Sequence, residues 1–263
     1  MDNNPRDGRP SSTVSPRRRN PLSRSLEKYV VTGSVTQVRA VTASMLAIRM
    51  VADEPITFPY QPGQHIRVQI NDPLSLYGIV RPSQTLRTYT IVNFSRPDRE
   101  VEIWAHLHEN DGIGATWART VQRGDLVTYW WPQCEFHPVQ GEHHLFVGEE
   151  SAAAAFVSMV AAIEPDQPVR AVLESAGPDH DVPLAEGADV RRVHRGSASA
   201  ASSLALQTAV AELALPESPG VAYVAGEART CQAVRNHLVQ ERGWPRKSIK
   251  VKPFWTPGKY GLH

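Results

Sequence analysis

The sequence lacks several features that would assign a protein to a class at once. No stretch approaches the roughly 18 apolar residues that a transmembrane helix needs, and residues 1–26 contain no apolar core like that of a secretory signal. The two cysteines, Cys134 and Cys231, are too few for a disulfide framework. These absences favour a cytoplasmic protein without a membrane span.

Neither sign of charge predominates in the sequence. It contains 28 Lys and Arg residues and 27 Asp and Glu residues, which gives a net charge of +1. This balance gives no electrostatic reason to expect a nucleic-acid partner. The arginine cluster at 17–19 lies in a Pro- and Ser-rich leader, residues 1–26, which we expect to be disordered. No catalytic triad stands out. No metal site is predicted, because no third ligand accompanies His106 and His108.

Short β-like runs fill the first half of the remaining chain. Turns rich in Pro, Gly, Asn and Asp separate them, a pattern typical of a closed or sandwiched antiparallel sheet. The runs cover residues 29–41, 45–51, 65–70, 87–94, 100–108 and 125–131, with one helix at 115–122. We predict an antiparallel β-barrel domain across residues 27–140.

Strands and helices alternate in the second half. Such alternation implies a doubly wound parallel sheet covered on both faces. The expected strands are 144–150, 168–175, 189–195, 220–227 and 249–255, and the helices are 151–164, about 202–213 and 228–243. The predicted fold class is therefore β + α/β, with the α/β domain at residues 141–263. His137, His143 and His144, near the boundary, are expected in a surface loop.

The segment LRTYTIVNF, residues 86–94, combines a cation with an aromatic ring on one face of a strand. Because alternate strand residues share a face, Arg87 and Tyr89 point one way, and Thr88 and Thr90 the other. This pair suits a flat, anionic, aromatic ligand, with Arg87 on a phosphate. The alternative is an ordinary strand with an exposed arginine.

The segment HENDGIGATWARTVQRGD, residues 108–125, leads a glycine pair into a helix start. Helix N-termini offer free N–H groups to phosphates, and Gly112 and Gly114 let the backbone come close to an anion. His108 is a further candidate contact. The alternative is a hairpin loop followed by an ordinary helix start.

Two turns repeat the order strand, glycine, acid, helix. One contains Gly148, Glu149 and Ser151, and the other contains Gly226 and Glu227. Loops at the carboxyl ends of parallel strands are where such sheets bind ligands, so the pair favours a dinucleotide crevice. Ser151 is expected to cap its helix, and Glu149 to accept from a ribose hydroxyl. No GxGxxG motif is present, and ordinary connections remain the alternative.

Together these segments resemble the siderophore-interacting protein family, the FAD-binding ferric-siderophore reductases among the ferredoxin-reductase-like flavoproteins. The resemblance covers about Tyr29 to Gly261. Its specificity comes from the order and spacing of six segments. They are LRTYTI at 86–91, HENDGIGATWA at 108–118, RGDLV at 123–127, VGEESA at 147–152, YVAGEA at 223–228 and RGWPRKSIKVKPFWTPG at 242–258.

The resemblance implies a flavin-binding barrel, an NAD(P)H-binding α/β domain and a set of site residues. The flavin contacts would be Arg87, Tyr89 and Thr90, and the FAD diphosphate site would be His108, Gly112, Ile113, Gly114, Ala115, Thr116 and Trp117. The nicotinamide nucleotide would face Gly148, Glu149, Ser151, Ala152, Ala225, Gly226 and Glu227. Trp255, with Phe254 and Lys259, falls where the family has an aromatic-basic tail over the flavin. Arg67, Lys252 and Lys259 are candidate contacts to an anionic siderophore, and Arg191, Arg192 and Arg195 to the 2′-phosphate of NADPH.

The sequence departs from the family's pattern at several of these positions. Val92 stands where the family has an arginine, Glu109 and Ile113 replace a glycine and a proline, and the tail FWTPG lacks two cations. Losing two charge-assisted contacts would weaken a cofactor by roughly 100-fold or more.

Three functions follow as hypotheses. The first is an FAD-dependent oxidoreductase that uses NAD(P)H to reduce a ferric siderophore, with no catalytic group beyond the flavin. The alternative is a divergent FAD-binding enzyme of secondary metabolism with non-redox or altered chemistry. The third is a non-enzymatic module that binds a siderophore.

Overall fold

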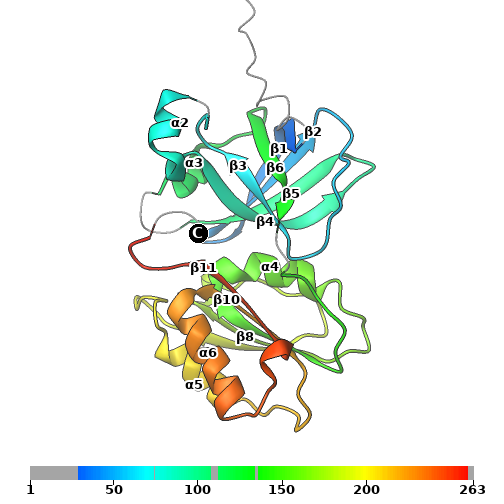
Figure 1. Cartoon of the computed structure of the whole chain (residues 1–263), viewed down its shortest axis with the longest axis vertical. Coiled ribbons are helices and arrows are strands. Elements are labelled where there is room, and N and C mark those ends of the chain that lie inside the picture. The colour runs from blue at the N-terminus through cyan, green and yellow to red at the C-terminus, as the bar shows by residue number, and fades with distance from the viewer. Residues whose placement is uncertain (1–28, 74, 108–111, 134–135, 260–263) are drawn as a thin grey trace, which may run out of the picture.

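A computed structural model describes residues 29–73, 75–107, 112–133 and 136–259. The described chain forms a closed barrel stacked on a five-stranded parallel sheet (Figure 1). The predicted fold class, β + α/β, is confirmed. The predicted leader, residues 1–26, lies outside the described residues, and the domain boundary at 140/141 remains a prediction.

The barrel contains six antiparallel strands in the order β1-β2-β5-β4-β3-β6. Its interior is an apolar cluster that includes Ile48, Ile66, Ile103 and Tyr129, all with essentially no exposed surface. The closure leaves no free sheet edge. The strands are β1 Val30–Thr42, β2 Met45–Ala52, β3 His65–Gln69, β4 Leu86–Ser95, β5 Glu100–His106 and β6 Leu126–Gln133.

Two short helices lie beside the barrel. α2, Leu76–Val80, and a 3-10 turn, Pro82–Gln84, join β3 to β4, and α3, Ile113–Thr120, precedes β6. The two helices lie on the same side of the barrel (Figure 1). The sequence did not predict α2, and it placed the start of α3 two residues too late.

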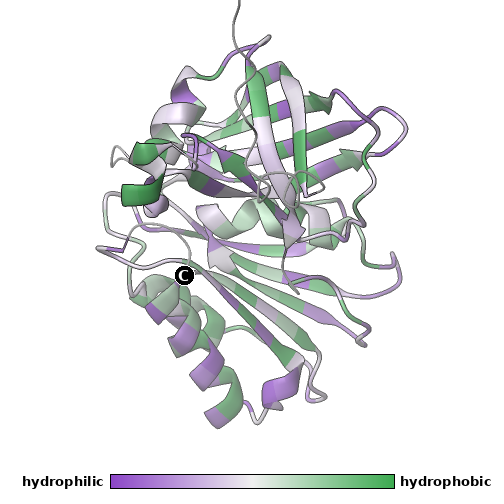
Figure 2. Cartoon of the chain, turned by 45° about the horizontal axis from the view of Figure 1, so that its top comes forward, coloured by the Kyte–Doolittle hydropathy of each residue, from purple (hydrophilic) through white to green (hydrophobic). Residues whose placement is uncertain are grey.

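The parallel sheet has the strand order β11-β10-β7-β8-β9. β7 and β10 are buried along their whole length because they are central and covered on both faces. Apolar residues run along the sheet, while α5 and α6 also carry hydrophilic ones (Figure 2). The elements are β7 His144–Glu149, α4 Glu150–Val160, β8 Val169–Ser175, β9 Asp189–His194, α5 Leu204–Ala211, β10 Val221–Glu227, α6 Ala228–Gln240 and β11 Ile249–Trp255.

α4 lies between the sheet and the barrel (Figure 1). Its run of alanines suits this place, because small side chains allow close packing on both sides. Ala153 and Ala154 belong to an apolar cluster with Val92 and Trp104 of the barrel. The Gly63 N–H also donates to the Ser158 hydroxyl across this boundary, at 3.0 Å.

The two histidines at the start of the sheet are not surface residues. His143 and His144 have exposed fractions of 6% and 1%. The His144 ring stacks on Tyr223, and its Nε2 lies 2.9 Å from Gln167 Oε1. The expectation of a surface loop is wrong for both residues, because His144 begins the covered strand β7 and the His143 ring, just before it, packs on Trp244. Among the described residues, no helix has the length and apolar character needed to cross a membrane.

Candidate functional site

Arg87 and Tyr89 point from β4 toward the start of α3. A Cβ atom placed on Gly114 would lie 2.9 Å from Tyr89 Oη and 3.0 Å from Arg87 Cγ, so both side chains contact this helix. The Tyr89 hydroxyl donates to the Gly114 carbonyl at 2.9 Å, and its ring packs on Trp117 with centroids 5.4 Å apart. Burial raises the pKa of Tyr89, which keeps this donor protonated. The shared face expected from strand alternation is present.

The Arg87 guanidinium is held by backbone carbonyls. Its Nη1 donates to Ser83 O and to Leu86 O, both at 2.7 Å. Within the part of the chain that the structure describes, Arg87 makes no ion pair, and burial lowers its pKa. A half-buried cation without a counter-charge is suited to an anionic ligand.

The start of α3 supplies N–H groups at the same place. Gly112 is the residue before the helix, with extended backbone and no side chain to accept from the first turn. Nothing lies within 4 Å of a Cβ placed on Gly112. This open, uncapped helix end beside Arg87 fits the diphosphate of FAD. His108 lies outside the described residues.

The other residues of the barrel domain that were predicted to bind FAD differ in exposure. Thr90 is buried opposite His65 on β3, and Ala115 is buried against the barrel, so its side chain is turned away from a ligand. Ile113 is half-buried, and Thr116 is exposed. The last two are therefore within reach of a bound molecule.

The acids of the two glycine turns cap helices in the structure. Glu149 precedes α4 and accepts from the Ser151 N–H at 2.8 Å. Glu227 precedes α6 and accepts from the Arg229 and Thr230 N–H groups at 3.0 and 2.9 Å. The expectation that Ser151 caps its helix is wrong, because the helix begins one residue earlier, at Glu150. These carboxylates occupy the donors that a phosphate would use.

The glycines of these turns allow close packing of protein against protein. A Cβ on Gly148 would lie 2.5 Å from the Ala225 carbonyl oxygen, and one on Gly226 would lie 2.7 Å from Glu149 Oε1. Gly226 also has φ +120°, in the region that favours glycine. Ala152 and Ala225 are buried, and their side chains are covered by protein. That they contact a nucleotide remains a prediction.

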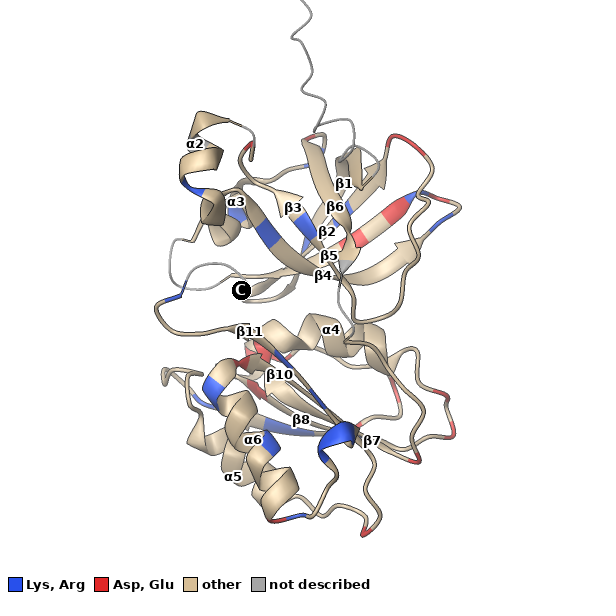
Figure 3. Cartoon of the chain, in the orientation of Figure 1, with Lys and Arg blue, Asp and Glu red and all other residues tan. Residues whose placement is uncertain are grey.

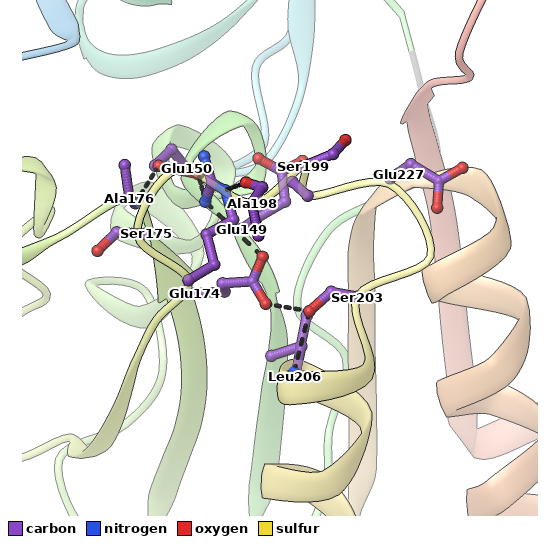
Figure 4. Close-up of polar contacts among 12 residues, drawn as sticks. Glu149, Glu150, Glu174, Ser175, Ala176, Ala198, Ser199, Ser203, Leu206 and Glu227 are labelled. Carbon is purple, nitrogen blue, oxygen red and sulfur yellow. Dashed lines mark hydrogen bonds and ion pairs between the residues drawn. The ribbon is translucent and has the colours of Figure 1, made fainter.

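A buried carboxylate cluster that sequence reasoning missed lies at the same edge (Figure 4). It consists of Glu149, Glu150 and Glu174, with Arg195 as its cation. Arg195 Nη1 lies 2.7 Å from Glu150 Oε2 and 3.7 Å from Glu174 Oε1, and the Ser203 hydroxyl donates to Glu174. The adjoining cavity holds about 10 Å³, the size of one water. This cluster is therefore packed protein rather than an open pocket.

The pKa values of the three carboxyl groups are shifted in different directions. Burial raises the pKa of Glu149 and of Glu174. Burial also acts to raise the pKa of Glu150, but the hydrogen bond and charge of Arg195 outweigh it and lower the pKa. Arg195 therefore stabilises the charged form of Glu150 in particular.

The arginines expected to bind a 2′-phosphate are paired within the chain. Arg191 Nη2 lies 2.6 Å from Glu212 Oε2, and Arg192 Nη1 lies 3.9 Å from Asp181 Oδ1. Arg195 belongs to the carboxylate cluster. Each would have to exchange a carboxylate for the phosphate, so the structure adds no support to a preference for NADPH.

Two of the three candidate substrate cations lie near one another across the domains. Burial first, then the charges of Lys252 on β11 and Arg67 on β3, lower the pKa of His65 to about 4. Basic segments are visible on β3, β4 and β11, on either side of the domain boundary (Figure 3). Lys259 is exposed in the segment after β11. Among the described residues, no group of His, Cys, Asp and Glu could hold a metal ion.

Comparisons with known proteins agree with this arrangement. A family model described as "Siderophore-interacting protein" matches residues 141–258, and one described as "Siderophore-interacting FAD-binding domain" matches residues 79–136. The uncharacterized protein Rv2895c of Mycobacterium tuberculosis is 28% identical over 186 residues, which span 66% of each chain. The ferric vibriobactin reductase ViuB of Vibrio cholerae is 26% identical over 239 residues, 83% of this chain and 86% of that protein.

Solved structures show the same fold. A siderophore utilization protein from T. fusca has a TM-score of 0.78 at 23% identity, covering 89% of this chain and 95% of that one. A flavohem-like FAD/NAD-binding domain from Vibrio cholerae has a TM-score of 0.67 at 18% identity, covering 86% and 99%. The FAD-binding family model confirms the prediction of FAD.

Proposed function

Because the chain belongs to the siderophore-interacting protein family, which binds FAD, we propose that it is a flavin oxidoreductase that reduces a ferric siderophore with electrons from NAD(P)H. One observation carries the proposal. Arg87, without an ion-pair partner among the described residues, lies beside the uncapped start of α3 and the Tyr89 ring. A cation and a helix N-terminus can bind the diphosphate of a flavin dinucleotide, and an aromatic ring can pack on its flavin.

Each residue of the barrel has a defined part in this proposal. Arg87 and the N–H groups from Ile113 to Ala115 would hold the diphosphate, and Tyr89 would pack on the flavin. Bound FAD would supply the redox chemistry, carrying electrons from a reduced nicotinamide to ferric iron. The chain itself contributes binding, orientation and exclusion of water.

The siderophore would lie at the domain boundary near Arg67 and Lys252. The charges of both residues, together with burial, lower the pKa of His65. His65 is therefore neutral near pH 7 and able to accept or donate a hydrogen bond. Two cations from opposite domains suit an anionic ferric chelate. The name of the relative ViuB, ferric vibriobactin reductase, supports this class of substrate.

A second candidate function is an FAD-binding enzyme with non-redox chemistry. It is favoured by the two turns of the α/β domain that were predicted to bind the nicotinamide nucleotide. The donors at the starts of α4 and α6 already bind Glu149 and Glu227. A dinucleotide that needs these donors would have to displace a carboxylate. In this function the flavin would be held but not reduced by NADH or NADPH.

Anaerobic stopped-flow mixing separates the two candidates. The FAD-loaded protein is mixed with NADH or NADPH, and then with a ferric siderophore and a chelator that reports Fe(II). Bleaching of the flavin absorbance followed by Fe(II) release is the expected result. Bound flavin that neither nucleotide bleaches would overturn the proposal in favour of the second candidate. Purified protein that takes up no FAD would overturn both.

A further inference from the structure

The indole of Trp255 is tied to a buried carboxylate two strands away. Trp255 Nε1 donates to Glu149 Oε1 at 2.9 Å. Trp255 is the last residue of β11 and is half-buried, while Glu149 is 3% exposed. The same carboxylate accepts from the N–H and the hydroxyl of Ser151. Glu149 therefore joins the start of α4 to the end of β11.

Two irregularities of the backbone make this contact possible. β10 lies between β7, which carries Glu149, and β11, so the carboxylate must pass over β10. It does so at Gly226, where any Cβ would lie 2.7 Å from Glu149 Oε1. The pairing of β10 with β11 also shifts there, since Gly226 pairs with Pro253 and Glu227 with Trp255. The extra residue, Phe254, packs into the core.

The end of β11 borders the barrel on the side of the proposed flavin site. Lys252, three residues before Trp255, lies near enough to His65 on β3 to lower its pKa. The segment after β11 runs along the domain boundary on the side of the barrel that carries α3 (Figure 1). Trp255 therefore lies at this boundary, and Glu149 is its anchor on the α/β side.

We propose that Glu149 is a positioning residue, which holds the Trp255 indole at the domain boundary so that the ring forms a fixed wall beside the flavin. The contact itself is independent of any cofactor. The placement of the ring beside the flavin rests on the proposed function. In this role Glu149 touches neither flavin nor nucleotide, which differs from the ribose contact expected from the sequence.

The test compares Glu149→Ala with Glu227→Ala, a matched control. Both variants remove a glutamate that caps a helix at the sheet edge, but only the first removes the acceptor of the Trp255 indole N–H. The readout is solvent exchange of the Trp255 indole N–H in the FAD-free protein, measured by NMR and identified by its loss in Trp255→Phe. We expect about tenfold faster exchange in Glu149→Ala, the effect of losing one hydrogen bond, and little change in Glu227→Ala.

A second readout uses the FAD-loaded proteins, because a neighbouring indole quenches flavin fluorescence. Glu149→Ala and Trp255→Phe should both raise this fluorescence, and Glu227→Ala should not. Trp255→Phe keeps an aromatic side chain but removes the indole and its N–H donor while leaving Glu149 in place, so it remains informative if Glu149→Ala fails to fold. Equal exchange rates of the Trp255 indole N–H in Glu149→Ala and Glu227→Ala would overturn the proposal that Glu149 holds Trp255. Unchanged flavin fluorescence in Trp255→Phe would overturn the placement of the Trp255 ring beside the flavin. If no protein binds FAD, the proposed function fails, while the exchange comparison still decides the anchor.

Discussion

At the scale of a single residue, Arg87 is the cation on which cofactor affinity should depend most. Arg87→Gln removes the charge beside the open start of α3. Losing a charge-assisted hydrogen bond costs about 1.5–3 kcal/mol, so the Kd for FAD should rise by about 10–100-fold. Quenching of flavin fluorescence on titration into the apoprotein measures this.

Arg123→Gln is the control for this change, because Arg123 is exposed in the turn after α3. It should leave the Kd nearly unchanged. An equal loss of affinity in both variants would mean that the overall charge, and not the position of Arg87, governs binding.

Gly226 is the residue at which packing and backbone strain coincide. Gly226→Ala places a Cβ 2.7 Å from Glu149 Oε1 at φ +120°. The backbone strain alone costs about 1–3 kcal/mol, and the clash adds to it. Gly124→Ala, at φ +95° with nothing near its Cβ, should cost only the strain. Urea unfolding of both variants checks this, and equal losses would show that the Glu149 contact is unimportant.

Individual side chains were harder to predict than the strands that carry them. The shared face of Arg87 and Tyr89 follows from strand alternation, which is a local property. The contact between Glu149 and Trp255 joins residues 106 positions apart, and no local pattern reveals it. Arg195 likewise meets Glu150 and Glu174 only because three strand ends come together.

At the scale of an element, α3 is the helix that lacks a side-chain cap where an anion is proposed. Gly112→Asp should supply a cap and a favourable charge at the helix N-terminus, raising the free energy of unfolding of the apoprotein by about 0.5–1 kcal/mol. The same carboxylate should compete with the diphosphate and lower the affinity for FAD. Thermal unfolding of the apoprotein and FAD titration measure the two effects.

This test depends on two effects of opposite sign, a more stable apoprotein and a weaker affinity for FAD. Gly112→Asn caps without a charge, so it should stabilise the apoprotein while weakening FAD less than Gly112→Asp does. Unchanged FAD affinity in both variants would place the diphosphate away from the start of α3.

The strands were predicted to within a few residues, because alternating and continuous apolar runs specify them locally. α2 was missed for a physical reason. Leu76, Ile79 and Val80 are 66–81% exposed, so these apolar residues do not mark a buried helix face that the sequence could display. The early start of α3 was missed because Ile113 lies between two glycines, and that of α4 because Glu150 was assigned to the preceding strand.

At the scale of the whole molecule, two departures from the family's pattern contact each other. Val92 stands where the family has an arginine, and Ala153 and Ala154 stand where the nucleotide turn of the family commonly has a leucine and a proline. All three belong to one apolar cluster between barrel and sheet. The sequence shows each change separately, and only the packing of α4 on β4 shows that they fit together. Part of the domain boundary is therefore apolar contact, while the cations gather near β3 and β11.

His65 reports on this boundary, because one of the charges that lower its pKa comes from the other domain. Its pKa falls from 6.5 to about 4, so folding favours the neutral imidazole. The stabilisation is complete above pH 6.5 and is lost as the pH falls toward 4, by roughly 3 kcal/mol in all. The difference in unfolding free energy between wild type and His65→Gln should fall by that amount between pH 7 and pH 4.

The contribution of the second domain to this shift can be isolated. Lys252→Met removes a positive charge on β11 and should raise the pKa of His65, which an NMR titration of the His65 ring protons measures. Lys247→Met, in the exposed turn before β11, should leave that pKa unchanged. The acid loss of stability should still begin near pH 6.5 in Lys252→Met, but it should be smaller and end at a higher pH than in wild type, because the folded-state pKa lies closer to 6.5. An unmoved His65 pKa would mean that the sheet does not meet the barrel at β3, and that Arg67 and Lys252 form no common site.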